Sequence, residues 1–374
     1  MQTTSLVSPP AALPGRPAAG PDSSLARRGA IPQPSPAARV ALRVAAALAP
    51  ALAARALARR FLTPRRVRLE QRERDLLAKA DRLAIPFAGR HPRRAEADGV
   101  VGYVWGGAGP TVLLVHGWSS AAGQLAAFVE PLRRHGFRVA AFDAPGHGAS
   151  GGTSTSAFEI AEVVLAAGRL LGPLHAVVGH SAGAAAVAFA ATRGLAAERL
   201  ALVSPWARPQ IWVERYAAAF GLSRSMTTRL VHAVEAEAGA PLHAIGLSAT
   251  APAVANPTLL VHDRDDALVE VADARAAAAK LPSGTLVETH GLGHSRILRA
   301  REAVGPVVEF LARPAEPAPA PRAVPGQRDG RGGSSASSPL RLPARGLAAR
   351  HVAGAAVVLA AWATLWASFL AAVW

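Results

Sequence analysis

The chain has 374 residues and contains no cysteine. This absence excludes a disulfide framework, a thiolate metal site and a cysteine nucleophile. Lysine is nearly as scarce, since only Lys79 and Lys280 are lysines among the 41 basic residues. The N-terminal residues also lack the layout of a signal peptide, because the first apolar run begins only near residue 40.

Acidic residues are few, and their distribution decides what the net charge of +16 means. Residues 1–99 hold 18 basic and 7 acidic side chains, residues 313–374 hold 7 and 2, and residues 100–312 hold 16 of each. A nucleic-acid-binding fold carries a basic face within the domain. The neutral central region excludes that class, and we expect no nucleic-acid partner. The basic flanks indicate either contact with anionic membrane or a compositional preference for arginine.

Short apolar runs alternate with helical stretches from about residue 100 onward. This alternation predicts an α/β fold with a mostly parallel central sheet covered by helices. The expected strands are 100–105, 111–115, 138–142, 175–178, 200–203, 258–261 and 285–289. Upstream of them, residues 69–83 predict a short amphipathic helix.

The composition changes along the chain and divides it into parts. The interval 205–250 has no convincing strand and predicts a small helical cap within the α/β domain. The predicted organisation is 1–35 disordered, 36–99 a basic helical lead-in, 100–312 the α/β domain, 313–351 a disordered linker and 352–374 a membrane span.

The last 23 residues, 352–374, are uncharged and mostly apolar. About 20 apolar residues span a bilayer, and a buried helix is rarely so apolar on every side, so we expect a C-terminal transmembrane helix. Arg341, Arg345 and Arg350 precede it and no charge follows, so the positive-inside rule predicts a membrane-anchored protein with its α/β domain in the cytoplasm. The alternatives are an alanine-rich segment that packs on the protein, and a wholly cytoplasmic protein.

Ser181 lies in the stretch VVGHSAG, between Gly179 and Gly183. The stretch is typical of a short apolar strand, then a turn, then a helix. A nucleophilic serine on such a strained turn has its hydroxyl lifted above the sheet, and the flanking glycines let strand and helix approach closely. The pattern predicts that Ser181 is a nucleophile.

A serine nucleophile of this kind needs an oxyanion hole. The Ala182 amide, at the start of the following helix, supplies one donor. The turn in TVLLVHGWSS supplies the second, because Gly117 permits the tight bend that directs the Trp118 amide at the oxyanion. We therefore expect the N–H groups of Trp118 and Ala182 to form the hole.

Two later loops offer partners for the serine. The stretch TLLVHDRDDALVE offers Asp263, Asp265 and Asp266 as the carboxylate that orients an imidazole. In TLVETHGLGHSRIL, a glycine-flanked loop before the last helix offers His294, with His290 as the weaker candidate. The resulting order of serine, aspartate and histidine fits the topology of the sheet.

With these motifs, residues 100–312 resemble the α/β-hydrolase superfamily, near its esterase, monoacylglycerol-lipase-like and serine-aminopeptidase-like branch. Two further stretches carry the resemblance. FDAPGHGAS, residues 142–150, is similar to the D-x-P-G-H-G-x-S loop of the family, and HGW is similar to its H-G-x turn. The resemblance implies an α/β-hydrolase fold with Ser181 as the nucleophile and His294 as general base and acid.

The same resemblance favours Asp266 as the orienting carboxylate, because the family pattern places that residue three positions before a valine, here Val269. Asp263 and Asp265 remain alternatives. The family often has glycine where Asp263 stands and proline where Glu270 stands, and this chain departs from it at both positions.

The resemblance implies a serine hydrolase, like a carboxylesterase or lipase, that cleaves a carboxylic ester through an acyl-enzyme. The expected partners are a small-molecule or lipid ester, thioesters included, and a membrane through residues 352–374. The alternatives are a non-catalytic binding protein of the same fold and an acyltransferase or amidase. We expect no cofactor and no metal, because no cluster has metal-ligand spacing and GGTSTS lacks the lysine of a phosphate loop.

Overall fold

The computed structural model describes residues 34–88 and 99–314. The predictions of disorder for 1–35 and of a linker for 313–351 fall almost wholly outside these residues. The predicted membrane span, 352–374, lies entirely outside them.

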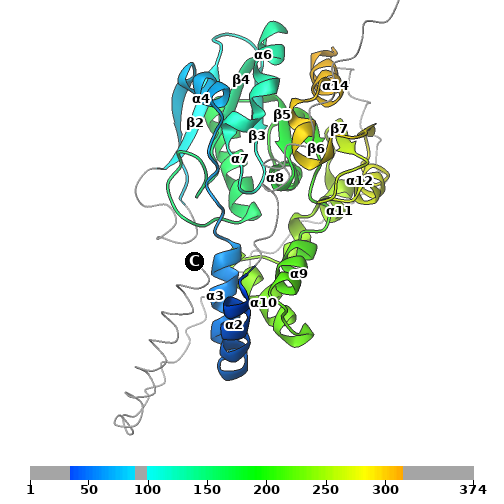
Figure 1. The fold of residues 1–374 in the computed structure, drawn as a ribbon. Coiled ribbons are helices and arrows are strands. Elements are labelled where there is room, and N and C mark those ends of the chain that lie inside the picture. The colour runs from blue at the N-terminus through cyan, green and yellow to red at the C-terminus, as the bar shows by residue number, and fades with distance from the viewer. Residues whose placement is uncertain (1–33, 89–98, 315–374) are drawn as a thin grey trace, which may run out of the picture.

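An eight-stranded sheet forms the centre of the structure (Figure 1), in the order β1-β2-β4-β3-β5-β6-β7-β8. From β4 to β8 all neighbours are parallel, whereas β2 pairs antiparallel with both β1 and β4. The mostly parallel sheet confirms the prediction, and all seven expected strands are present. The strands are β1 (Asp81–Ile85), β2 (Val100–Trp105), β3 (Thr111–Val115), β4 (Arg138–Phe142), β5 (Leu174–His180), β6 (Ala197–Val203), β7 (Thr258–Asp263) and β8 (Gly284–Thr289).

Strand β1 corrects the prediction of one helix over residues 69–83. Helix α4 (Gln71–Ala78) opens with a capping box between Glu70 and Glu73 and ends before β1 begins at Asp81. β1 pairs with β2 along all five of its residues. Ladder hydrogen bonds to a distant segment therefore outweigh the local helical pattern.

Helices cover both faces of the sheet (Figure 1). On one face pack α6 (Ala126–Arg134) and α14 (Arg301–Ala312), and on the other α7 (Ala157–Leu171), α8 (Ala182–Ala191) and α12 (Val271–Ala278). The single-turn helices are η1 (Ala122–Leu125), η2 (Leu242–Ile245), α11 (Leu247–Thr250), η3 (Ala251–Ala253), α13 (Gly293–Arg296) and η4 (Ile297–Arg299).

Helix α8 has the sequence AGAAAVAFAA and is buried nearly all round. Its small side chains leave room for a close approach to the sheet. A Cβ atom on Gly179 would lie 2.6 Å from the Cα of Ala184, and one on Gly183 would collide with the carbonyl oxygen of His116. The contact fixes where α8 starts, and with it the position of Ser181, the residue before its first turn.

The first two helices of the predicted lead-in pack with the cap. Helices α2 (Pro36–Leu48) and α3 (Pro50–Phe61) pack against α9 (Gln210–Ala219) and α10 (Arg224–Ala238) of the predicted cap interval. Leu42 and Leu57 of the first pair are buried in one cluster with Leu230 and Val234 of α10. This packing brings the end of α3 close to the carboxyl ends of the central strands β3 and β5.

The predicted fold class needs one correction, which concerns the C-terminal transmembrane helix. Across 34–88 and 99–314, no helix is long and apolar enough to cross a membrane. The longest helices there, α7 and α10, have 15 residues each. Such a helix is about 22 Å long, whereas the hydrocarbon core is about 30 Å thick. The fold of the described residues is an α/β sheet with a helical cap, and the predicted C-terminal transmembrane helix has no support in it.

Candidate active site

Ser181 lies on a strained turn between β5 and α8. Its φ of +54° and ψ of −119° place it in a region that non-glycine residues rarely adopt, at a cost of about 1–3 kcal/mol. Two backbone hydrogen bonds hold the turn. The N–H of Ser181 donates to the carbonyl of Val203 at 2.9 Å, and the carbonyl of Ser181 accepts from the N–H of Trp206 at 3.2 Å. The turn exposes the serine hydroxyl to the loops that follow the neighbouring strands.

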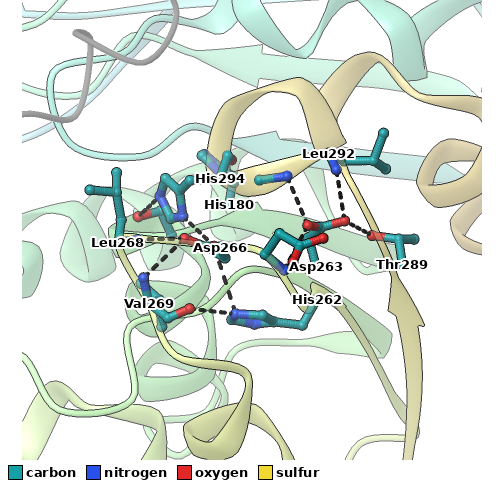
Figure 2. A network of polar contacts seen from close by, with 12 residues as sticks. His180, His262, Asp263, Asp266, Leu268, Val269, Thr289, Leu292 and His294 are labelled. Atoms are coloured by element: carbon teal, nitrogen blue, oxygen red, sulfur yellow. Dashed lines mark hydrogen bonds and ion pairs between the residues drawn. The ribbon is translucent and has the colours of Figure 1, made fainter. Parts of the chain in front are cut away.

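A chain of hydrogen bonds joins the three residues predicted to act together. His294 Nε2 lies 2.9 Å from Ser181 Oγ, and His294 Nδ1 lies 2.7 Å from Asp266 Oδ2. The other oxygen of Asp266 accepts from the backbone N–H groups of Leu268 and Val269 at 2.9 and 3.0 Å (Figure 2). This geometry fits a neutral imidazole that donates to the carboxylate and accepts from the serine hydroxyl.

The carboxylate of Asp266 is held in its ionised form. The residue is 6% exposed, and burial raises its pKa. The hydrogen bond from His294, the electrostatic interaction with that ring and the two backbone donors outweigh burial and lower the pKa to about 2.

The alternative carboxylates do not contact the His294 ring. Asp263 is fully buried and accepts four hydrogen bonds within its own loop and the histidine loop (Figure 2). The donors are Asp265 N–H at 3.0 Å, Thr289 Oγ1 at 2.7 Å, Leu292 N–H at 3.1 Å and Gly293 N–H at 2.9 Å. Asp265 lies at the surface with His290, 3.0 Å apart. Of the three aspartates, the structure brings only Asp266 to His294.

The turn after β3 lies directly against the serine. A Cβ atom on Gly117 would lie 3.0 Å from both Ser181 Cβ and His180 Nδ1. In the described part of the chain, neither the Trp118 N–H nor the Ala182 N–H has a protein acceptor. Both N–H groups can therefore donate a hydrogen bond to the oxygen of a bound molecule.

Two buried histidines shape this turn. His116 Nδ1 lies 2.8 Å from the Gly117 carbonyl, and its Nε2 accepts from Ala144 N–H at 2.9 Å. His147 Nε2 accepts from Ser119 N–H at 3.0 Å. Burial and the neighbouring His116 lower the pKa of His147 to about 3, so this ring stays neutral and keeps its lone pair for Ser119.

Two more buried histidines flank the site (Figure 2). His180 Nε2 lies 3.1 Å from the carbonyl of His294, and His262 Nε2 lies 2.9 Å from the carbonyl of Val269. Burial and the adjacent His294 lower the pKa of His180 to about 3, and burial lowers that of His262. Both rings act as neutral donors to backbone next to the hydrogen-bonded chain.

Sequence reasoning missed Arg66, which holds the loop that carries His147. Its guanidinium donates to four backbone carbonyls of the 147–152 loop. The acceptors are the carbonyls of His147, Gly148, Ser150 and Gly152. The adjacent Arg65 N–H donates to Ser119 Oγ at 3.0 Å. No pattern in the arginine-rich lead-in distinguishes Arg66 from its neighbours, because its acceptors lie some 80 residues away.

Replacing Arg66 by methionine should loosen the turn that carries Trp118. For the ester substrate and the oxyanion donors predicted from the sequence, we expect kcat to fall about tenfold with KM within twofold, because displaced donors would weaken binding of the transition state more than that of the substrate. Steady-state kinetics on Arg66→Met and on Arg68→Met, an exposed arginine of the same segment, checks this. Equal loss in both variants would contradict the assigned role of Arg66.

A cavity of about 150 Å³ opens at Ser181 and His294. Its aromatic lining is Phe61, Trp118, Trp206, Trp212 and Tyr216. The tryptophans form a continuous array, with ring centroids 6.5 Å apart from Trp118 to Trp206 and 5.6 Å apart from Trp206 to Trp212. Within 34–88 and 99–314 no group of three or more acidic or histidine side chains could hold a metal ion.

A family model described as "Alpha/beta hydrolase family" matches residues 112–307. The match includes the serine turn, both partner loops and the cap interval. The chain belongs to the alpha/beta hydrolase family. Membership of this family confirms the resemblance seen in the sequence and supports hydrolase activity.

Solved structures of the same fold are similar to this alpha/beta hydrolase. An esterase from Pyrococcus furiosus is 22% identical, with 66% of this chain and 98% of that chain covered and a TM-score of 0.50. A putative lipase from Acinetobacter baumannii is 18% identical, with 66% and 97% covered and a TM-score of 0.48. At 22% identity the comparison with the esterase shows the fold alone. A search of curated proteins finds no match.

Proposed function

We propose that this alpha/beta hydrolase is a serine esterase that works through Ser181, His294 and Asp266. The observation that carries the proposal is the hydrogen-bonded chain from Ser181 Oγ through the His294 ring to the ionised Asp266, at 2.9 and 2.7 Å. A serine hydroxyl is a weak nucleophile unless an adjacent base takes its proton as it attacks. The chain supplies that base and holds it in the required tautomer.

In the first half-reaction, Ser181 Oγ attacks the ester carbonyl carbon while His294 Nε2 takes the hydroxyl proton. The carbonyl oxygen becomes an oxyanion and accepts hydrogen bonds from the N–H groups of Trp118 and Ala182. Donors of this kind are each worth about 10²–10³ in kcat. The carbon–oxygen bond to the alcohol then breaks, and the imidazolium gives its proton to the departing alcohol. An ester of Ser181 remains.

In the second half-reaction, water attacks the acyl-enzyme while His294 takes one of its protons. The bond to Ser181 Oγ breaks, the serine regains its proton from His294, and the carboxylic acid leaves. Asp266 does not take a proton in either half; its charge stabilises the imidazolium each time it forms.

The cavity lining favours an ester with an apolar acyl group. Five aromatic side chains surround the serine, and of the described residues that line the cavity none is aspartate or glutamate. An enzyme that binds a free amino terminus needs an anion to pair with the ammonium group. Ester cleavage therefore fits the lining better than the release of amino-terminal residues from peptides.

The test is labelling of the full-length chain with a fluorescent fluorophosphonate, which reacts with an activated serine. The full chain is used because Phe61 and its neighbours in α3 line the cavity. We expect labelling of the wild type and at least a 10³-fold slower rate in Ser181→Ala and His294→Ala. A folded wild-type protein that does not label would contradict the proposal and favour a non-catalytic binding role.

A further inference from the structure

We propose that Arg215, in helix α9 of the cap, is a positioning residue that holds the loop of Asp266. The inference rests on the proposed function, in which Asp266 orients His294. It adds that the cap acts on the chemical step as well as on binding. Residues 264–270, between β7 and α12, are called the acid loop below.

The acid loop has no regular structure of its own to fix its shape. No residue from 264 to 270 lies in a helix or strand, and four of these seven residues are exposed. The N–H groups of Leu268 and Val269 both donate to Asp266 Oδ1, at 2.9 and 3.0 Å. The direction of the carboxylate therefore depends on where these two peptide groups lie.

Arg215 holds one of these peptide groups from its other end. Its Nη1 donates to the carbonyl of Leu268 at 2.7 Å, and this carbonyl and the N–H of Val269 belong to the same planar peptide group. A charged donor makes a hydrogen bond about twice as strong as a neutral one, and a peptide group polarised at its carbonyl donates more strongly at its N–H. Arg215 therefore acts on Asp266 through one peptide group, on its position and on the strength of its donor.

The position of the Arg215 side chain is set by the aromatic residues of the cavity. Its guanidinium lies over the ring of Trp212, 5.5 Å from the ring centroid, in a cation–π contact. Trp212 stacks on Trp206 with ring centroids 5.6 Å apart, and the N–H of Trp206 donates to the carbonyl of Ser181. The cap therefore reaches both ends of the hydrogen-bonded chain, the serine through Trp206 and the carboxylate through Arg215.

A second arginine joins the cap to a different part of the α/β domain. Arg208 pairs with Asp273 of α12 through two contacts, Nε to Oδ2 at 3.1 Å and Nη2 to Oδ1 at 2.9 Å. Arg208 and Arg215 line the same small cavity. A change at Arg208 therefore removes a cap contact of similar chemistry outside the acid loop, which makes Arg208 the matched control.

The experiment measures kcat and KM of the full-length protein for 4-nitrophenyl butyrate. We expect Arg215→Gln to lower kcat about tenfold with KM within threefold, because a displaced acid loop misorients the base and leaves the cavity in place. Arg208→Gln should keep kcat within twofold of wild type. Arg215→Lys keeps a cationic donor without the planar fork, and we expect its kcat to lie only about threefold below wild type.

Three results would overturn the proposal. They are equal losses of kcat in the two glutamine variants, a change in KM alone in Arg215→Gln, and a lysine variant no more active than the glutamine variant. Melting curves of all three variants verify folding, so that a loss of kcat is measured on folded protein.

A second readout separates this proposal from that of ester hydrolysis. If the wild type cleaves no ester, the esterase proposal fails, but a proton–nitrogen correlation spectrum of protein with isotope-labelled histidine still reports which nitrogen of His294 carries the proton. The spectrum of His294→Ala identifies the signal. In the neutral ring we expect the proton on Nδ1 in the wild type and in Arg208→Gln, and a mixture of both tautomers in Arg215→Gln. A wild-type spectrum in Arg215→Gln would overturn the role of Arg215, whatever the activity.

Discussion

Replacing Asp266 by asparagine is expected to lower kcat by about 10³–10⁴-fold with little change in KM. The oxygen of Asp266 that accepts from the N–H groups of Leu268 and Val269 can be retained by the carbonyl oxygen of asparagine. The amide nitrogen then faces His294 Nδ1, where the wild type has a carboxylate oxygen at 2.7 Å. Facing a donor, the imidazole moves its proton to Nε2 and can no longer take one from Ser181.

The control is Asp265→Asn, which removes a charge one position away. Asp265 pairs with His290 at the protein surface, where their side chains are 58% and 86% exposed. We expect its kcat to stay within twofold of wild type, because exposed pairs contribute little. Single-turnover kinetics and melting curves on both variants check the prediction. An active Asp266→Asn protein would assign the orienting role to a different carboxylate.

The sheet could be predicted from the sequence because the signal for its strands is local. All five residues of β3 are buried, and TVLLV reads as a strand whatever its neighbours are. β1 gave no such signal, since three of its five residues are exposed and only pairing with β2 makes it a strand. Edge strands of this kind depend on partners that a single window of sequence does not contain.

The residue types of the candidate site were predictable from the local pattern, whereas the choice of Asp266 among its neighbours came only from the family resemblance. By residue type alone, the three aspartates within four positions are equivalent. Their donors distinguish them, and those of Asp263 include Thr289, Leu292 and Gly293, at least 26 residues away. The lead-in helices show the same limit on a larger scale, because α3 lines the cavity through packing on helices some 170 residues later.

Replacing Asp263 by asparagine is expected to lower both the stability of the protein and its kcat, although Asp263 does not contact the His294 ring. Its carboxylate accepts four donors, and the Thr289, Leu292 and Gly293 groups among them start the loop that carries His294. An asparagine of the same size turns an N–H₂ group toward some of these donors and leaves them buried without an acceptor. We expect a loss of about 3 kcal/mol, a fall in Tm of roughly 10 °C, and kcat lower by about 10- to 100-fold.

The matched control is Thr289→Val, which removes one donor and keeps the charge and three donors in place. Its cost should be about 1 kcal/mol, with kcat within threefold of wild type. Thermal melts and steady-state kinetics on both variants measure the difference. If Thr289→Val were as damaging as Asp263→Asn, the packing at this position, and not the carboxylate, would hold the loop.

The pH dependence of stability separates the charge of Asp263 from its shape. Burial raises the pKa of Asp263, but the hydrogen bonds from Thr289, Gly293, Leu292 and Asp265 outweigh it and lower the pKa below its ordinary value. A carboxylate with a lowered pKa stabilises the folded state above the pKa of the unfolded chain, about 3.9, and loses this contribution as pH falls through the lower folded value. The stability advantage of the wild type over Asp263→Asn should therefore be full at pH 6 and shrink below about pH 4. An advantage that stays constant down to pH 3 would show that the carboxylate acts through its shape alone, because only a difference in charge can make it vary with pH.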